Sequence, residues 1–363
     1  LGRGYLSGAG ITLGDASRQG PAELAISSDN VHNQTMELNH NINVVYSPAQ
    51  LKRLLFETFA NGTLISVNSD ITLNDNLQVY INDAAETGGS QNYVNFNGRF
   101  KDGATTSGNL SLTADEADGT ASNSTNGRTY NYFVLRGDNS LWTGDVRLNT
   151  NTGYDHDQTA ILRLEHINAL TAANDVEMGF NSMLQVGGGS RTIGALTTNG
   201  GVGPFVGGPA GGTMGSSTNG STEIIENASS TQGTLTIVQS TPASTEVLWD
   251  AHFRDGTLNS QFFAPGTYPT VSAALNVVKA GNGWATLTLD NNYTGTTSVI
   301  GGILQVGRNG VGDTGALNAA GLNSAVNTTV SGTGQIHGTS HILGSLRPGD
   351  EAGADGQCAP DAV

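Results

Sequence analysis

The sequence predicts an all-β protein, and three observations support that fold class. Short runs of β-forming residues, such as residues 63–67, 76–81 and 234–238, are each bounded by turn residues. The chain contains 51 Gly, which supply tight corners where φ is often positive. Helical periodicity is almost absent. We therefore expect an ordered array of short strands and turns instead of a disordered Gly-rich chain.

One segment, residues 47–59, has a helical pattern and is the exception. Ser47 is a candidate N-cap, and Pro48 follows at a first-turn position. Several apolar residues of this segment would share one face of a helix: Leu51, Leu54, Leu55 and Phe59. We expect at most one short helix here, packed on the flank of the β-structure. A helix that docks a partner is the alternative interpretation.

Internal repetition predicts that the strands form a solenoid. Residues 283–307 contain two apolar runs, and the turn Tyr293-Thr294-Gly295 separates them. An earlier segment, residues 134–146, places Trp142-Thr143-Gly144 at the equivalent position. In a solenoid each repeat buries its apolar face against its neighbours. The residues that we expect to define the repeat and its stacked core are Trp142, Thr143, Gly144, Leu287, Leu289, Tyr293, Thr294, Gly295, Ile303, Leu304 and Val306.

These residues give the chain a resemblance to the strand repeat of bacterial autotransporter passenger domains. Residues 183–196 are similar to the closing element of that repeat, and residues 330–350 are similar to the segment that often follows it. The family builds right-handed parallel β-helices at the outer surface of bacteria. The resemblance therefore implies a single right-handed parallel β-helix, or β-solenoid, over residues 1–350, made of about two and a half long copies. Residues 351–363 would form a C-terminal tail.

Three stretches interrupt the strand pattern and are predicted to project as loops: 84–91, 114–128 and 200–220. The first two are polar, and the third is very rich in Gly. We interpret the third as a surface loop and not as a linker, because residues 223–228 resume the repeat pattern. At roughly 20–25 residues per coil, the β-helix would have about 15 coils and a length of about 70 Å.

The charge balance restricts the partners of the chain. It has 31 Asp and Glu against 15 Lys and Arg, a formal net charge of −16. Phosphate binding needs a basic surface, so we expect no nucleic-acid partner. No run of about 18 apolar residues occurs, so we expect no membrane-spanning segment in this chain. The chain opens with Leu1 and without Met, and we interpret it as a mature fragment or as one section of a longer precursor.

Neither end of the sequence contains an obvious cap for a β-helix, whose terminal strands leave backbone groups unpaired. We therefore expect partners at the ends: further copies of this chain in a stacked or fibrous homo-oligomer, or further repeats of a longer precursor. Host or environmental surface glycans are further candidate partners. The single cysteine, Cys358, cannot form an internal disulfide. We interpret it as an inert thiol, with an intermolecular bridge as the alternative.

Candidate catalytic residues are few. Asp155 and Asp157 flank His156, and glycoside hydrolysis needs two carboxyl groups about 5–10 Å apart. These residues lie in a turn-like segment, so we interpret them as a solvated loop and predict that the chain is not an enzyme.

Candidate metal ligands are equally few. Asp155 and Asp157, together with Asp138 and Asp145, would supply oxygen ligands of the kind that Ca²⁺ prefers. The glycine-rich calcium repeat is absent, so we expect no metal or other cofactor and keep Ca²⁺ as the alternative.

The sequence therefore predicts a non-catalytic protein of the extracellular space or the bacterial outer surface, structural or adhesive, that acts as a rigid rod or fibre component. The alternative is a carbohydrate-active or carbohydrate-binding β-helix, similar to polysaccharide lyases and hydrolases or to a receptor-binding fibre of the phage type. Release of sugar fragments from a polysaccharide would identify the enzyme, and a trimeric state would favour the fibre.

Overall fold

The computed structural model covers residues 1–363 and describes residues 10–15, 21–27, 35–47, 50–58, 64–83, 91–116, 129–150, 158–179, 182–198, 223–242, 244–256, 273–289, 291–307 and 320–349. The secondary-structure elements in these ranges are all β-strands, which confirms the predicted all-β class. The chain divides into two compact units, Leu1–Ala169 (unit 1) and Leu170–Val363 (unit 2). The described residues include no helix long and apolar enough to span a membrane.

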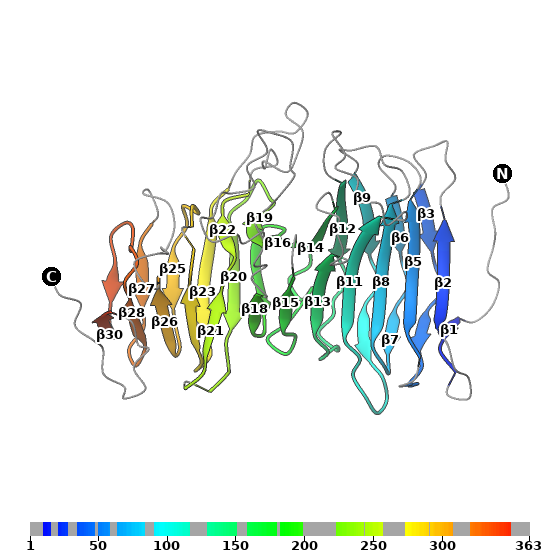
Figure 1. Ribbon diagram of the computed structural model, residues 1–363, viewed down its shortest axis with the longest axis horizontal. Helices are drawn as coiled ribbons and strands as arrows, with labels where there is room; N and C mark the ends of the chain where they lie inside the picture. Colours follow the sequence, from blue (N-terminus) through cyan, green and yellow to red (C-terminus); the bar gives the residue numbers. More distant parts are fainter. Residues whose placement is uncertain are drawn as a thin grey trace. The chain divides into compact units, whose positions relative to one another are not determined.

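The strands of unit 1 lie side by side in three parallel sheets (Figure 1). Sheet A contains, in order, β1 (Ile11–Leu13), β4 (Ile42–Val44), β7 (Ile71–Leu73) and β10 (Phe100–Asp102). The unit 1 part of sheet B contains β2 (Ala22–Ser27), β5 (Lys52–Thr58), β8 (Leu77–Asp83), β11 (Leu110–Glu116) and β13 (Val146–Thr150). Sheet C contains β3 (Thr35–Leu38), β6 (Leu64–Val67), β9 (Gln91–Phe96), β12 (Thr129–Leu135) and β14 (Gln158–Leu164).

Strands β1 to β12 of unit 1 pass through the three sheets in turn, and β13 and β14 then belong to sheets B and C. Strand β4 returns to sheet A beside β1, and Ile42 of β4 then pairs with Ile71 of β7. Equivalent corner residues such as Asn39 and Asn68 are 29 positions apart. The expected coil of roughly 20–25 residues is therefore too short for this part of unit 1, because each passage contains three strands and the corners between them.

The core of unit 1 includes aliphatic columns that cross the sheets. In sheet B, Leu54, Val79, Leu112 and Leu148 pair in register, and each is fully buried. Burying one such side chain contributes roughly 1.5–3 kcal/mol. Each strand of the column therefore places a Leu or Val side chain at the same position in the core.

Unit 2 has a different arrangement of parallel strands. Strand β15 (Val176–Met178) pairs with β18 (Leu196–Thr198), and β19 (Ile224–Asn227) lies between β16 (Ser182–Val186) and β22 (His252–Arg254). Sheet D contains β17 (Gly189–Ile193), β20 (Gly233–Val238), β23 (Leu275–Ala280), β25 (Thr297–Val299), β27 (Leu322–Ser324) and β29 (His341–Ile342). Sheet E contains β21 (Glu246–Trp249), β24 (Trp284–Leu287), β26 (Ile303–Val306), β28 (Thr329–Gly332) and β30 (Ser345–Pro348).

The helix predicted over residues 47–59 is wrong, because residues 52–58 form the strand β5. Lys52, Leu54 and Phe56 are buried and alternate with more exposed neighbours, which is the period of a strand. Leu51, which the helical pattern placed with the apolar face, is 47% exposed. Pairing with both β2 and β8 overrides the local helical pattern.

Most of the predicted loops lie outside the described residues. This is true of residues 84–90, 117–128 and 200–220, and of the predicted tail over 351–363. The described parts of the loop segments are strand: Gln91 begins β9, and residues 114–116 end β11.

Candidate functional site

The two aromatic turns of the predicted repeat occupy buried corners, one in each unit. In unit 1, Trp142 is fully buried, and its Nε1 donates a hydrogen bond to the carbonyl of Gly108 at 2.9 Å. Its ring centroid lies 5.4 Å from that of Phe100, which lies 5.1 Å from that of Phe96. A chain of three aromatic rings therefore fixes this corner.

Unit 2 builds the same corner with different side chains. Tyr293 is fully buried, and its hydroxyl oxygen lies 2.5 Å from Oγ1 of Thr297. Its ring centroid is 6.4 Å from that of Phe253, which is 6.1 Å from that of Trp249. The spacing Phe96–Phe100 in unit 1 is thus repeated as Trp249–Phe253 in unit 2.

A carboxylate clamps the threonine of each turn. In unit 1, Asp102 accepts hydrogen bonds from the Thr143 backbone N–H at 2.9 Å and from its hydroxyl at 2.8 Å. In unit 2, Asp255 accepts equivalent bonds from Thr294, at 3.1 Å and 2.5 Å. Burial raises the pKa of Asp102, but hydrogen bonds from Ser107 and Thr143 outweigh it and hold the pKa below its ordinary value. This carboxylate is therefore ionised at neutral pH.

The glycine of each turn is required by close backbone contact. A Cβ atom at Gly144 would lie 2.0 Å from the carbonyl oxygen of Gly108. A Cβ atom at Gly295 would lie 2.1 Å from the carbonyl oxygen of Leu275. Any larger residue would force the turn away from the neighbouring backbone.

The side chain of an asparagine before each turn accepts a backbone hydrogen bond that a neighbouring strand would otherwise accept. Its Oδ1 accepts the backbone N–H of a strand residue: Asn139 from Phe100 at 2.7 Å, and Asn291 from Phe253 at 2.8 Å. Strand β10 is the last strand of sheet A, so the Asn139 side chain satisfies a donor that a further strand would otherwise bind.

The sequence analysis missed the partner segment of these turns. Both clamps use a Phe-Lys/Arg-Asp-Gly tetrapeptide, at residues 100–103 and 253–256. The clamping aspartate precedes its threonine by 41 residues in unit 1 and by 39 in unit 2. The recurrence of the tetrapeptide at nearly constant distance from Trp/Tyr-Thr-Gly is the signal that would have identified it.

The other predicted repeat residues lie in or beside sheet E. Leu287 and Val306 pair in register and are each 1% exposed, and Leu304 is also 1% exposed. Leu289 follows β24 and is 2% exposed. Ile303 begins β26 and is only partly buried, so it lies at the border of the core.

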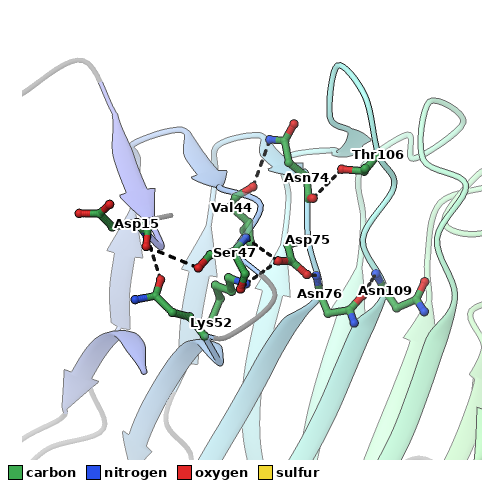
Figure 2. Close-up of polar contacts among 10 residues, drawn as sticks. Asp15, Val44, Ser47, Lys52, Asn74, Asp75, Asn76, Thr106 and Asn109 are labelled. Atoms are coloured by element: carbon green, nitrogen blue, oxygen red, sulfur yellow. Dashed lines mark hydrogen bonds and ion pairs between the residues drawn. The ribbon is translucent and has the colours of Figure 1, made fainter. Parts of the chain in front are cut away.

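Asn and Asp side chains link equivalent positions of successive strands. Oδ1 of Asn76 accepts the backbone N–H of Asn109 at 2.9 Å, and Oδ1 of Asn109 accepts that of Asp145 at 2.9 Å. Figure 2 shows the first of these bonds. In unit 2, Oδ1 of Asn276 accepts the N–H of Thr296 at 2.9 Å. Each acceptor lies just before or at the start of a strand, so these ladders set the register of the strand that follows.

A second ladder runs along an exposed corner of unit 1. Nδ2 of Asn68 donates to Oδ1 of Asn39 at 2.7 Å, and Nδ2 of Asn97 donates to Oδ1 of Asn68 at 2.7 Å. These three asparagines recur every 29 residues. This 29-residue spacing is a sequence signal for the length of one coil, and the longer repeats described above do not contain it.

Lys52 forms a buried ion pair with Asp75 at another corner of unit 1 (Figure 2). The Lys52 ammonium lies 2.5 Å from Oδ2 of Asp75 and also donates to the carbonyl of Ser47. The same Oδ2 accepts the Ser47 N–H at 2.8 Å, and Oδ1 accepts the N–H of Asn76 at 2.8 Å. Burial raises the pKa of Asp75, but the bonds from Lys52, Ser47 and Asn76 hold it below its ordinary value.

Lys279 points into unit 2 and binds backbone carbonyls. Its ammonium donates to the carbonyl oxygens of Gly281, Gly283 and Gly301, at 2.8, 2.5 and 2.7 Å. The side chain is fully buried, and burial lowers the pKa of Lys279 to about 8. Lys279 is therefore still mainly protonated at neutral pH, and three carbonyls match its three N–H donors.

A third buried charge is Glu226 of β19, which is bound by side chains of β16 and β22. Glu226 is 1% exposed and accepts hydrogen bonds from Nε2 of Gln185 and from Nε of Arg254, each at 2.8 Å. Both carboxylate oxygens are therefore occupied by groups of the protein.

The candidate catalytic and Ca²⁺ residues Asp155 and Asp157 lie outside the described residues, as does Cys358. Asp138 is described, and its Oδ1 accepts bonds from the Ser140 N–H and from Nδ2 of Asn168, each at 3.1 Å. In the part of the chain that the structure describes, no three His, Cys, Asp or Glu residues form a group suited to a metal ion. Comparison with protein-family models, with curated proteins and with solved structures found no match.

Proposed function

We propose that this chain is a non-catalytic structural or adhesive protein of the extracellular space or the bacterial outer surface, folded as a right-handed parallel β-helix. One observation carries the proposal: backbone pairing and side-chain ladders repeat together. In sheet A each strand pairs in parallel with its equivalent three strands later, and corner asparagines bond to the next equivalent position. The right hand follows because crossovers between parallel strands of one sheet are right-handed almost without exception.

In this proposal the buried charges have a structural and not a catalytic role. A general acid or base must reach a substrate and exchange a proton with it. Lys52, Lys279 and Glu226 are instead buried and bonded to groups of the protein itself. Such groups stiffen a scaffold, which is what a surface rod or fibre component requires.

Small-angle scattering and electron microscopy of the purified chain test the β-helix. We expect an elongated particle, and a compact globular one would contradict the proposal. Incubation with plant and algal polysaccharides tests the alternative function. Release of reducing or unsaturated sugar ends would identify a carbohydrate-active enzyme.

Stacking of copies or of further repeats at the ends is part of this proposal. Leu346 of β30 is 54% exposed, although Leu304 and Val330 in the same column are buried. A further strand would cover Leu346. However, β30 ends at Pro348, and proline is one of the residues that blunt a sheet edge. Filaments in electron micrographs would support stacking.

A further inference from the structure

The outer face of sheet D in unit 2 carries no charged side chain. Its six strands contain neither Asp nor Glu. Their only Lys and Arg, Lys279 and Arg191, lie on the inner side of the sheet and are 0% and 7% exposed. The whole chain has a formal net charge of −16, so this face differs from its general character.

The strand register arranges the outward side chains of sheet D in columns. The central column consists of Thr192, Thr236, Val278, Ser298, Asn323 and His341. A second column consists of Ser190, Thr234 and Asn276. A third column begins with Val238 and its neighbour Ala280, which is only 8% exposed. Ile300 and Leu343 extend this column just after β25 and β29, where they are 58% and 57% exposed. The face is thus a grid of hydroxyl, amide and aliphatic groups with the His341 imidazole at one edge, spaced about 4.8 Å between strands and about 6.6 Å along them.

Sheet B of unit 1 shows that a charge-free face is not a general property of this chain. Its outer side carries Glu23, Arg53, Glu57 and Arg147. There the Arg53 guanidinium lies 4.9 Å from the ring centroid of Tyr80, and its Nε donates to Gln78 at 2.8 Å. A solvated face of this kind is the ordinary case for a surface sheet.

We propose that the outer face of sheet D is an interface between two copies of this chain, which pack sheet against sheet about a two-fold axis. Copies with the same strong negative charge repel each other wherever their acidic surfaces meet, whereas a face without carboxylates permits close approach. Short Ser, Thr and Val side chains let two sheets pack at about 10 Å. Interface cores are depleted in charged residues, and the face shares this one feature with them. The strands of the face contain no Trp, Tyr or Phe on which a sugar ring would stack, which disfavours a glycan as the occupant.

The size of the face determines the expected affinity. Six strands and three columns span roughly 25 by 15 Å, a footprint of about 400 Å² per copy. Stable interfaces bury about 800 Å² per partner. Sheet D alone therefore supports only a weak dimer. Salt should strengthen it, because added ions screen the repulsion between the two acidic copies. This inference goes beyond the proposed function, since end-to-end stacking would use strand edges and not this face.

Sedimentation velocity of the full chain from about 5 to 500 µM, at low and at 0.5 M NaCl, tests the interface. We expect a monomer–dimer equilibrium that shifts to the dimer with concentration and with salt. Thr236→Lys places a charge at the centre of the face and should weaken association at least about tenfold. Ser111→Lys is the matched control. Ser111 is a half-buried outward residue of sheet B, so this variant adds the same charge to a different face.

Several outcomes would overturn the inference. These are a monomer under all conditions, a Thr236→Lys variant that dimerises like the wild type, and a Ser111→Lys variant whose association is weakened as much as that of Thr236→Lys. A monomer that binds insoluble polysaccharide through sheet D would assign the face to a glycan instead. If Thr236→Lys does not fold, Asn323→Lys at an exposed position of the same column takes its place. Filaments that persist in Thr236→Lys would support end stacking independently of this interface.

Discussion

Replacement of Lys279 by Met should destabilise unit 2 by about 3 kcal/mol. The Lys279 ammonium donates to three backbone carbonyls, those of Gly281, Gly283 and Gly301. Met has a similar length but no donor, so each oxygen loses one hydrogen bond at about 1 kcal/mol, while that of Gly283 still accepts the backbone N–H of Ile303 at 3.1 Å. For a unit of this size, a loss of about 3 kcal/mol lowers Tm by about 6–12 °C.

Thermal unfolding followed by calorimetry or circular dichroism measures this shift. Lys101→Met is the matched control, because Lys101 makes a partly exposed ion pair with Asp70 at 2.9 Å. Exposed pairs contribute about 0–1 kcal/mol, so the control should melt within a few degrees of the wild type. Equal shifts of Tm in the two variants would refute the idea that the hydrogen bonds from Lys279 to the three carbonyls stabilise the turns of Gly281, Gly283 and Gly301.

The same variant tests the direction of the pKa shift. Burial lowers the pKa of Lys279 to about 8 in the folded chain, against about 10.4 in an unfolded one. Between these values the unfolded chain binds more protons, so the contribution of Lys279 to stability rises with pH and is lost as pH falls through 8. The stability of the wild type relative to Lys279→Met should therefore increase by up to about 3 kcal/mol from pH 8 to 10.5. A decrease would mean that the carbonyl bonds to the ammonium outweigh the cost of burial.

Three further predictions concern the repeat and its ion pairs. Gly144→Ala should lower stability by about 2–4 kcal/mol, because its methyl group meets backbone at 2.0 Å, and a melting curve checks this. Leu304→Asp should cost several kcal/mol, since it buries an unpaired charge, whereas Thr296→Asp should be nearly neutral because unit 1 has Asp145 at the equivalent position. Equal melting shifts of these two variants would contradict the strand register. The pKa of Asp75 is lowered in the folded chain, so its contribution to stability is present above pH ~4 and is lost as pH falls further. Asp75→Asn should remove that part of the acid sensitivity, as measured by chemical unfolding between pH 3 and 6.

The all-β class was predictable because turn residues punctuate short apolar runs. Residues 63–67, 76–81 and 234–238 correspond to β6, β8 and β20. The same reasoning failed over residues 52–58, where leucines at helical spacing lie on a strand. Local pattern was ambiguous there, and only the pairing of β5 with strands on both sides decides which side chains are buried.

The buried lysines could not be predicted from the sequence. Lys52 and Lys279 occupy inward positions that an alternating pattern assigns to apolar residues. Each is tolerated because its ammonium reaches polar groups at a corner: a carboxylate and a carbonyl for Lys52, and three carbonyls for Lys279. Asp75 and Gly301 lie 23 and 22 residues from their lysines, and only the fold brings them within bonding distance. The other partners are two to five residues away, but an alternating strand pattern does not show that the lysine turns toward them.

The comparison of the two clamps explains what the repeat preserves. Trp142 in unit 1 is replaced by Tyr293 in unit 2, so the identity of the aromatic ring is free to vary. The hydrogen bonds that Asp102 accepts from Thr143 have the same donors as those that Asp255 accepts from Thr294. Hydrophobic burial stabilises each corner without fixing its register, because one ring can replace another. The directional hydrogen bonds to the threonine fix the register, and they are therefore the part of the repeat that two different units have in common.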